Sequence, residues 1–231
     1  MRQACGEGIR KYPNPLAEPF RDRAAEILGL SSGCIICGFG SDDILTIAVR
    51  AFCDQGGTIA FPYPTYSLYE VLADIQGARS VTVEFPEDYS MPQDLADTGA
   101  DLTFLTNPNA PSGTMLPPGE VHELADAMNG VLLVDEAYVD FAELDCLDLA
   151  SRCSNVVISR TLSKSYSLAG LRFGYAVANE NLIAGMLKVK DSYNVSAPAV
   201  AGATAAIADR DHLATNLEKI IQTRQRLQAA L

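Results

Sequence analysis

Residues 155–172 read NVVISRTLSKSYSLAGLR, and this segment decides how the rest of the chain is interpreted. Its first residues, 155–158, form an apolar run that predicts a buried strand. Lys164 follows this strand among hydroxyl side chains, an unusual place for a lysine that only meets solvent. A lysine that is partly desolvated and near a second cation, here Arg172, is less favoured in its charged form and becomes available as an amine nucleophile. The segment therefore predicts Schiff-base chemistry at Lys164.

Strand and helix patterns alternate along the chain. We predict strands at 34–37, 58–61, 79–85, 101–106, 131–135, 155–158 and 173–178, and helices at 15–29, 41–53, 65–76, 118–128, 181–190, 198–208 and 211–231. This alternation is typical of an α/β fold in which helices sandwich a mostly parallel, mixed sheet. We expect a large domain over residues 1–210, with residues 211–231 beginning a long helix that leads toward a smaller C-terminal domain.

Three groups of polar residues come directly after predicted strands. Asn107 and its neighbours follow one strand, Asp135 ends another, and Lys164 follows a third. Ligands of such sheets bind at the carboxyl ends of the strands. We therefore expect the three groups to meet at one rim of the sheet.

A glycine-rich turn, Gly38-Phe39-Gly40, leads into a predicted helix that starts with Ser41 and Asp42. Free backbone amides and the helix dipole at such a turn favour a bound phosphate. The pattern also approaches the GxGxxG fingerprint of nicotinamide enzymes. However, Asp43 replaces the third glycine, and no acidic residue lies in a convincing place to bind a ribose. A phosphate cradle is the favoured interpretation.

The apolar strand predicted at 131–135 ends in a carboxylate, Asp135. Two interpretations remain open for this residue. It is either a helix or loop cap or a buried anion with a cationic partner, because an unpaired buried carboxylate becomes protonated.

A series of motifs in this chain resembles, in the same order, the fold-type I pyridoxal-phosphate (PLP) aminotransferases of classes I and II, in particular the histidinol-phosphate aminotransferases. The resemblance covers nearly the whole chain. The matching segments are Lys11-Tyr12-Pro13, Gly38-Phe39-Gly40-Ser41-Asp42, Pro64-Thr65-Tyr66-Ser67-Leu68-Tyr69, Asn107-Pro108-Asn109-Ala110-Pro111-Ser112-Gly113, Asp135-Glu136-Ala137-Tyr138, the segment 159–172 and Tyr193-Asn194-Val195-Ser196.

The resemblance implies catalytic roles for three residues. Lys164 would bind PLP covalently and then carry a proton between the substrate and the cofactor. Asp135 would keep the ring nitrogen of PLP in its charged form, and Tyr138 would donate a hydrogen bond to the phenolic oxygen of the ring.

The resemblance also implies a set of PLP contacts. The phosphate would be held by Gly40, Ser41, Asp42, Thr161, Ser163 and Arg172. Tyr66 would stack on the ring, although a tyrosine packed in the core also fits the local sequence. Tyr12 would reach the phosphate in the active site of a second subunit, which implies a homodimer with shared active sites, although an ordinary surface tyrosine is the alternative.

One position departs from the family pattern. The family usually carries asparagine immediately before Pro-Thr-Gly, and this asparagine bonds to the phenolic oxygen of PLP; here the position is Ala110. Either Asn109 reaches the oxygen instead, or Tyr138 acts alone.

Composition excludes several classes of protein. The chain has 231 residues and a net charge of −12, which argues against nucleic acids and anionic membranes as partners. It has no apolar run long enough to cross a membrane and no signal-peptide stretch, so we expect a cytoplasmic protein. We expect His122 and His212 on the surface, no metal site, and six reduced cysteines, with Cys34 and Cys37 structural rather than zinc-binding or redox-active.

The expected activity is transfer of an amino group between histidinol phosphate, or a similar amino acid, and a 2-oxo acid. The same residues also serve PLP-dependent decarboxylases and lyases, and an inactive PLP-binding fragment or paralogue would carry them too. The resemblance ends before the family's small domain, whose arginine grips the substrate carboxylate. We therefore expect PLP binding with weak or undetectable transamination by this chain, and an exposed apolar patch where that domain would pack.

Overall fold

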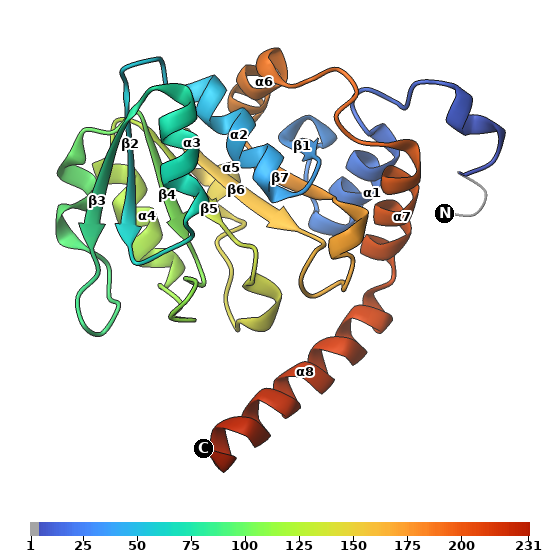
Figure 1. Cartoon of the computed structure of the whole chain (residues 1–231). Helices are drawn as coiled ribbons and strands as arrows, with labels where there is room; N and C mark the ends of the chain where they lie inside the picture. Colours follow the sequence, from blue (N-terminus) through green and yellow to red (C-terminus); the bar gives the residue numbers. More distant parts are fainter. Residues whose placement is uncertain (1–4) are drawn as a thin grey trace.

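The computed structural model describes residues 5–231 as a seven-stranded sheet with the order β1-β7-β6-β5-β4-β2-β3 (Figure 1). Strand β7 runs antiparallel to both β1 and β6, and the remaining neighbours are parallel. This confirms the predicted mixed, mostly parallel α/β fold. The strands are β1 (Ile35–Gly38), β2 (Thr58–Tyr63), β3 (Arg79–Glu84), β4 (Leu102–Thr106), β5 (Val131–Asp135), β6 (Val156–Thr161) and β7 (Gly174–Ala178).

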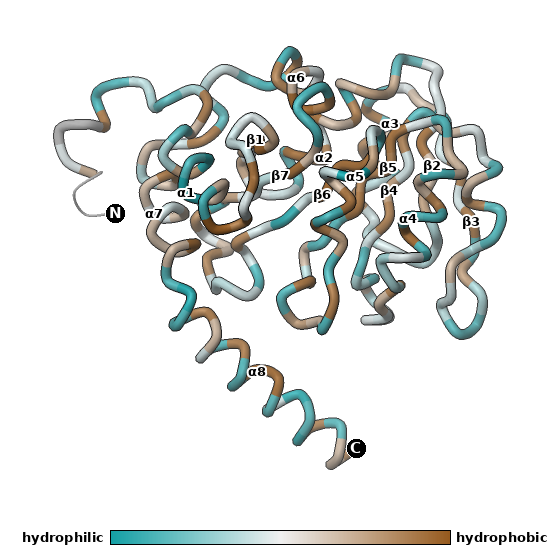
Figure 2. Tube along the Cα trace, turned by 180° about the vertical axis from the view of Figure 1, so that it is seen from behind, coloured by the Kyte–Doolittle hydropathy of each residue, from teal (hydrophilic) through white to brown (hydrophobic). Residues whose placement is uncertain are grey.

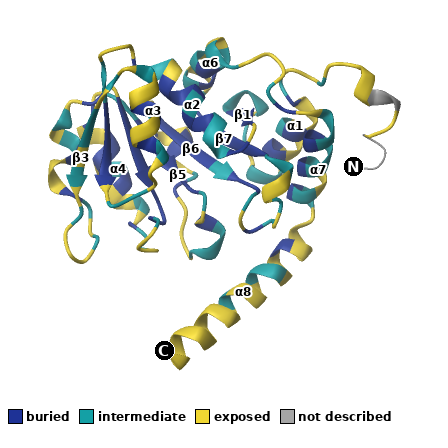
Figure 3. Cartoon of the chain, in the orientation of Figure 1, coloured by how far each residue is buried: buried dark blue, intermediate teal, exposed yellow. Residues whose placement is uncertain are grey.

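Helices cover both faces of the sheet, and two separate apolar clusters fill the space between the layers. Helices α1, α4, α5 and α7 pack on one face, and α2, α3 and α6 on the other. All strands except the edge strand β3 are largely buried as a result (Figure 3). The α-helices are α1 (Glu18–Leu28), α2 (Ser41–Phe52), α3 (Leu68–Gln76), α4 (Pro118–Ala127), α5 (Leu149–Arg152), α6 (Glu180–Val189), α7 (Ala197–Ala208) and α8 (Arg210–Ala230). The 3-10 helices are η1 (Glu7–Arg10), η2 (Ser32–Cys34), η3 (Gln93–Thr98), η4 (Val139–Phe141) and η5 (Ala169–Leu171).

Helix α8 projects away from the sheet and its layers (Figure 1). Leu213 near its start is buried, whereas Ile220 and Leu227 are exposed. Hydrophilic and hydrophobic residues alternate along it (Figure 2). The predicted helix is present, and its apolar residues form part of the exposed apolar surface that we expected. Among the described residues, none of the helices is both long and apolar enough to span a membrane.

Four predicted boundaries are wrong by two or three residues. Helix α1 begins at Glu18 rather than at residue 15, and strand β6 continues to Thr161 rather than ending at residue 158. Strand β2 continues through Pro62 to Tyr63. Strand β4 pairs only with Ile59 and Ala60 of β2, so the missing N–H of Pro62 removes no hydrogen bond between β2 and β4. Helix α3 begins at Leu68 rather than at residue 65, so Tyr66 lies in the preceding loop. The short helix α5 was not predicted, because four residues are too few to show helical periodicity.

The free cysteine thiols and the position of one of the two histidines follow expectation. All six cysteines are free thiols, and the described residues contain no His, Cys, Asp and Glu cluster able to hold a metal ion. His212 is exposed, but His122 is half-buried because it packs along α4 with its Nδ1 atom 3.6 Å from Asp126 Oδ2.

Gly174 allows β7 to approach the start of α2. A Cβ atom at this position would lie 2.5 Å from both Gly40 C and Ser41 N, and backbone atoms cannot move aside cheaply. We expect Gly174→Ala to lower the free energy of unfolding by about 1–3 kcal/mol, the usual cost of overpacking. Urea denaturation would measure this loss. Gly170→Ala is the matched control, since no atom lies within 4 Å of its added Cβ; equal stability of the two variants would contradict the predicted clash.

Candidate active site

A cavity of about 220 Å³ lies where the predicted polar groups meet. It is bordered by the start of α2, the loop before α3, the ends of β4, β5 and β6, and the segment that carries Arg172. The convergence expected from the sequence is therefore confirmed. The lining residues are Ser41, Asp42, Tyr66, Thr106, Ala110, Asp135, Ala137, Tyr138, Thr161, Ser163, Lys164, Ala169 and Arg172.

Asp135 is a buried carboxyl group in the wall of this cavity, only 3% exposed. Its Oδ2 accepts a hydrogen bond from the Tyr69 hydroxyl at 3.0 Å, and its Oδ1 accepts one from the Ala137 N–H at 3.2 Å. Burial raises the pKa of Asp135 to about 6, although these two hydrogen bonds and Lys164 act in the opposite direction. Within residues 5–231, no cationic side chain forms an ion pair with it. Asp135 is thus more than a loop cap and is open to a cationic ligand group.

The opposite end of the cavity suits an anion. Helix α2 starts at Ser41 with no side-chain cap from Gly40, so the amides of its first turn are free to bind a ligand. Arg172 Nη2 lies 3.3 Å from Asp42 Oδ2, and Thr161 Oγ1 donates to Ser163 Oγ at 3.0 Å.

Gly40 lets the arginine approach this turn. Its φ is +85°, a region that favours glycine, and an added Cβ would lie 2.6 Å from Arg172 Nη2. The glycine therefore places a guanidinium group beside the free amides of α2, a combination that binds phosphate oxygens.

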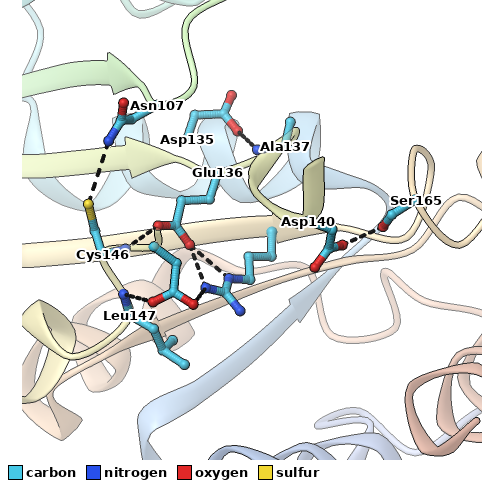
Figure 4. A network of polar contacts seen from close by, with 10 residues as sticks. Asn107, Asp135, Glu136, Ala137, Asp140, Cys146, Leu147 and Ser165 are labelled. Carbon is cyan, nitrogen blue, oxygen red and sulfur yellow. Dashed lines mark hydrogen bonds and ion pairs between the residues drawn. The ribbon is translucent and has the colours of Figure 1, made fainter. Parts of the chain in front are cut away.

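Lys164 lies on the loop after β6 and is exposed. Our expectation of partial desolvation is wrong for this structure, because the loop faces the open cavity. The Nζ atom lies 4.8 Å from the centroid of the Tyr138 ring. Ser165, next to the lysine, is buried and donates a hydrogen bond to Asp140, two residues after Tyr138 (Figure 4). This bond ties the two loops together and fixes Lys164 relative to Tyr138.

Tyr66 lies at the cavity and is 39% exposed, which excludes the core-packed alternative. Its hydroxyl donates to Asp42 Oδ1 at 3.3 Å, and its ring meets the ring of Tyr69 edge-on, at 88° and 5.7 Å between centroids. Partial burial and the negative charge of Asp42 raise the pKa of Tyr66. One ring face of Tyr66 is thus placed to stack on a planar ligand.

The side chain of Asn109 is hydrogen-bonded to its own loop and to the loop before α3. Its Oδ1 accepts from Thr65 at 2.9 Å, while its Nδ2 donates to Pro64 O at 3.2 Å and to Ser112 Oγ at 3.0 Å. Ala110, rather than Asn109, lines the cavity. This orientation does not support Asn109 as a replacement for the usual asparagine and leaves Tyr138 as the expected donor.

Tyr12 does not line the cavity of its own chain. It is 80% exposed and stacks on Tyr193, with 4.5 Å between ring centroids. Its predicted contact with a second subunit stays a prediction.

Sequence reasoning missed a buried ion pair beside the site. Arg160 Nε donates to Glu136 Oε2 at 2.8 Å, and Arg160 Nη2 forms an ion pair with the same oxygen at 2.7 Å. The Cys146 N–H donates to Glu136 Oε1 (Figure 4). Burial raises the pKa of Glu136, and Arg160 offsets part of this effect. The sequence did contain a signal for this pair. Arg160 is a charged residue within a predominantly apolar strand, and Glu136 carries the opposite charge beside the predicted site. The pair fixes the end of β5 against β6.

A second, larger cavity of about 690 Å³ adjoins the first and shares Ala110 and Tyr138 with it. Its wall is largely apolar and includes the side chains of Met115, Phe141, Leu144 and Ile220, together with Arg224. Arg224 is exposed on α8 as predicted, and the expected exposed apolar surface lies here.

Comparison with known proteins agrees with this geometry. The family model "Aminotransferase class I and II" matches residues 2–231. The chain belongs to this family. It is 46% identical over 229 residues to a histidinol-phosphate aminotransferase of Rhodopirellula baltica, covering 98% of the chain and 63% of that protein. It is 43% identical over 228 residues to histidinol-phosphate aminotransferase 1 of Trichormus variabilis, covering 98% of the chain and 65% of the relative.

A solved structure of histidinol-phosphate aminotransferase from Sinorhizobium meliloti, in complex with pyridoxal-5'-phosphate, has the same fold. The TM-score is 0.92 at 32% identity, with 98% of this chain and 64% of that chain covered. The chain therefore spans slightly less than two thirds of the length of these proteins.

The raised pKa of Asp135 gives a stability prediction for the cofactor-free chain. A folded-state pKa of about 6, above the unfolded value near 4, means that the ionised carboxylate destabilises the fold. This cost is absent below about pH 4 and complete above about pH 6. We expect Asp135→Asn to raise the free energy of unfolding at pH 8 by about 1–3 kcal/mol and to have little effect at pH 4. Urea denaturation at both pH values would test this; an equal effect at the two would refute the assigned titration.

Proposed function

We propose that this chain is the PLP-binding part of an aminotransferase that transfers an amino group between histidinol phosphate, or a similar amino acid, and a 2-oxo acid. The observation that carries the proposal is the convergence of Lys164, Asp135 and Arg172 on one cavity. Family membership and the names of the relatives support the choice of substrate.

The residues that line the cavity fit both the phosphate group and the ring nitrogen of PLP. The free amides of α2, Arg172 and the hydroxyls of Thr161 and Ser163 would hold its phosphate. Asp135, buried without a cationic side chain, would pair with a protonated ring nitrogen. When bound, PLP acts as an electron sink for the negative charge that develops on the substrate carbon.

Each remaining side chain has a defined task in this proposal. The Lys164 amine would hold the cofactor and would also accept and return the substrate proton at its Nζ. Tyr66 covers one face of the ring and Tyr138 donates a hydrogen bond from its hydroxyl. The Ser165–Asp140 hydrogen bond fixes the loop of Lys164 relative to the loop of Tyr138. Asp42 has a positioning role, since it contacts both Arg172 and Tyr66.

We further propose a homodimer in which Tyr12 completes the site of a second subunit, and a cytoplasmic location. The exposed, stacked position of Tyr12 supports an intermolecular role.

The activity can be tested on the PLP-loaded chain with histidinol phosphate and a 2-oxo acid such as 2-oxoglutarate. We expect PLP-dependent formation of glutamate that is lost in Lys164→Ala and retained in the matched control Lys219→Ala, which changes an exposed lysine of α8. Borohydride reduction and peptide mapping should locate PLP on Lys164. Covalent attachment without any glutamate would refute amino transfer by this chain, and attachment to another lysine would refute the assigned anchor.

The phosphate site predicts a selective defect. Arg172→Gln removes charge-assisted hydrogen bonds, so we expect PLP to bind roughly 10- to 100-fold more weakly, while pyridoxal, which lacks the phosphate, loses little affinity. Fluorescence titration with both compounds would measure the two affinities. Arg152→Gln, which changes an exposed arginine of α5, should leave both unchanged. Equal losses for PLP and pyridoxal would place Arg172 elsewhere than at the phosphate.

A further inference from the structure

A chain of hydroxyl groups leads from Asp135 to the loop that carries Asn109. The Tyr69 hydroxyl lies 3.0 Å from Asp135 Oδ2 and 2.6 Å from Thr106 Oγ1. Thr106 Oγ1 lies 2.9 Å from Thr65 Oγ1, which in turn lies 2.9 Å from Asn109 Oδ1. Tyr69, Thr106 and Asn109 are buried, so these contacts are largely shielded from water.

The number of hydrogens in this chain is limited. Four contacts share the hydrogens of only three hydroxyl groups. Asn109 does not supply a fourth, because its Nδ2 already donates to Pro64 O and Ser112 Oγ and its Oδ1 faces Thr65. When Asp135 is ionised it only accepts, and one contact lacks a hydrogen. When Asp135 carries a proton on Oδ2, all four contacts are made, each donor pointing away from Asp135.

We infer that Tyr69, Thr106 and Thr65 are positioning residues that form a directional hydrogen-bond chain, which couples the protonation of Asp135 to the anchoring of the Asn109 loop. When Asp135 is ionised, the Tyr69 hydroxyl donates its hydrogen to the carboxylate, and Thr106 then donates to Tyr69. The single hydroxyl hydrogen of Thr65 is left to serve two acceptors, Thr106 Oγ1 and Asn109 Oδ1. The contact between Thr65 and Asn109 is weakened as a result. The significance for catalysis rests on the proposed role of Asp135, whereas the coupling itself is a property of the cofactor-free chain.

Other titratable groups also face Asp135. They are Tyr66 in the loop before α3, Asp42 from α2, and Lys164 from the loop after β6. The variants proposed below change none of them.

The coupling can be measured on the cofactor-free chain by following the Asp135 carboxyl group with ¹³C NMR during a pH titration, with Asp135→Asn to assign its signal. Tyr69→Phe removes the hydrogen that stabilises the carboxylate, so the pKa of Asp135 should rise. Thr65→Val acts three contacts away. It removes the second acceptor for the Thr106 hydrogen, so the pKa of Asp135 should fall, by roughly 0.5–1 unit for one neutral hydrogen bond.

Thr103→Val is the matched control. Thr103 is buried on the same strand, β4, and its hydroxyl has no hydrogen-bond partner, so its loss should leave the titration unchanged. If Thr65→Val does not fold, Thr65→Ala carries the same expectation. The inference is overturned if the Thr65 variant titrates like the unmodified chain, shifts in the same direction as Tyr69→Phe, or is matched by Thr103→Val. Because the titration uses neither PLP nor substrate, a failed transaminase assay would leave its outcome unaffected.

Discussion

The buried carboxyl group of Asp135 is the constraint on which the arrangement of the site depends. It lies at the end of β5, between β4 and β6, with 3% of its surface exposed and a pKa raised to about 6 by burial. A carboxyl group in such a place needs either a proton or a cation. The fold provides two hydrogen-bond donors but no ion-pair partner among the described residues, which leaves room for a cationic group of a ligand. The other groups of the cavity are arranged around that position.

The adjacent residue, Glu136, meets the same physical problem with the opposite solution. Successive side chains of a strand point to opposite faces, so Asp135 faces α3 while Glu136 faces the Arg160 side of the sheet. Arg160 compensates the charge of Glu136 at 2.7 Å and joins β5 to β6. The charge of Glu136 is thus balanced within the protein, and the ion pair stiffens the end of the strand. Asp135 is left without such a partner and can pair with a ligand. A rigid support of this kind is what precise placement of a reacting group requires.

The sequence predicted the parts of the fold with strong local signals. Strand β5 has the predicted bounds, and Asp135 and Lys164 meet at one rim, because buried parallel strands are apolar runs whose carboxyl ends share an edge. The start of α3 was wrong because Thr65, a good helix-start residue by local criteria, is bonded instead to Thr106 and Asn109, far along the chain. Tertiary contacts of this kind leave no trace in local periodicity.

Tyr69 was missed for a related reason. In the sequence of an amphipathic helix, a tyrosine that bonds to a functional carboxylate cannot be told from one that fills the core. Tyr69 does both: its hydroxyl bonds to Asp135, and its ring stacks on Phe104 with 4.5 Å between the ring centroids. The exposure of Lys164 was unpredictable because a strand pattern gives no information on how far the following loop opens.

The departure at Ala110 and the orientation of Asn109 have a joint consequence for the wall between the two cavities. Ala110 and Tyr138 line both cavities. The amide of Asn109 instead bonds to Pro64, Thr65 and Ser112, and it does not line the smaller cavity. A methyl group therefore stands where the resembling aminotransferases usually present an amide. Tyr138 remains the hydrogen-bonding side chain of this shared wall, and the Ser165–Asp140 bond holds its loop beside Lys164. In the proposed reaction, a substrate at this shared wall would meet Tyr138 and Lys164 together. The geometry of their two loops, rather than an additional polar contact from Ala110, would then set its position relative to Lys164.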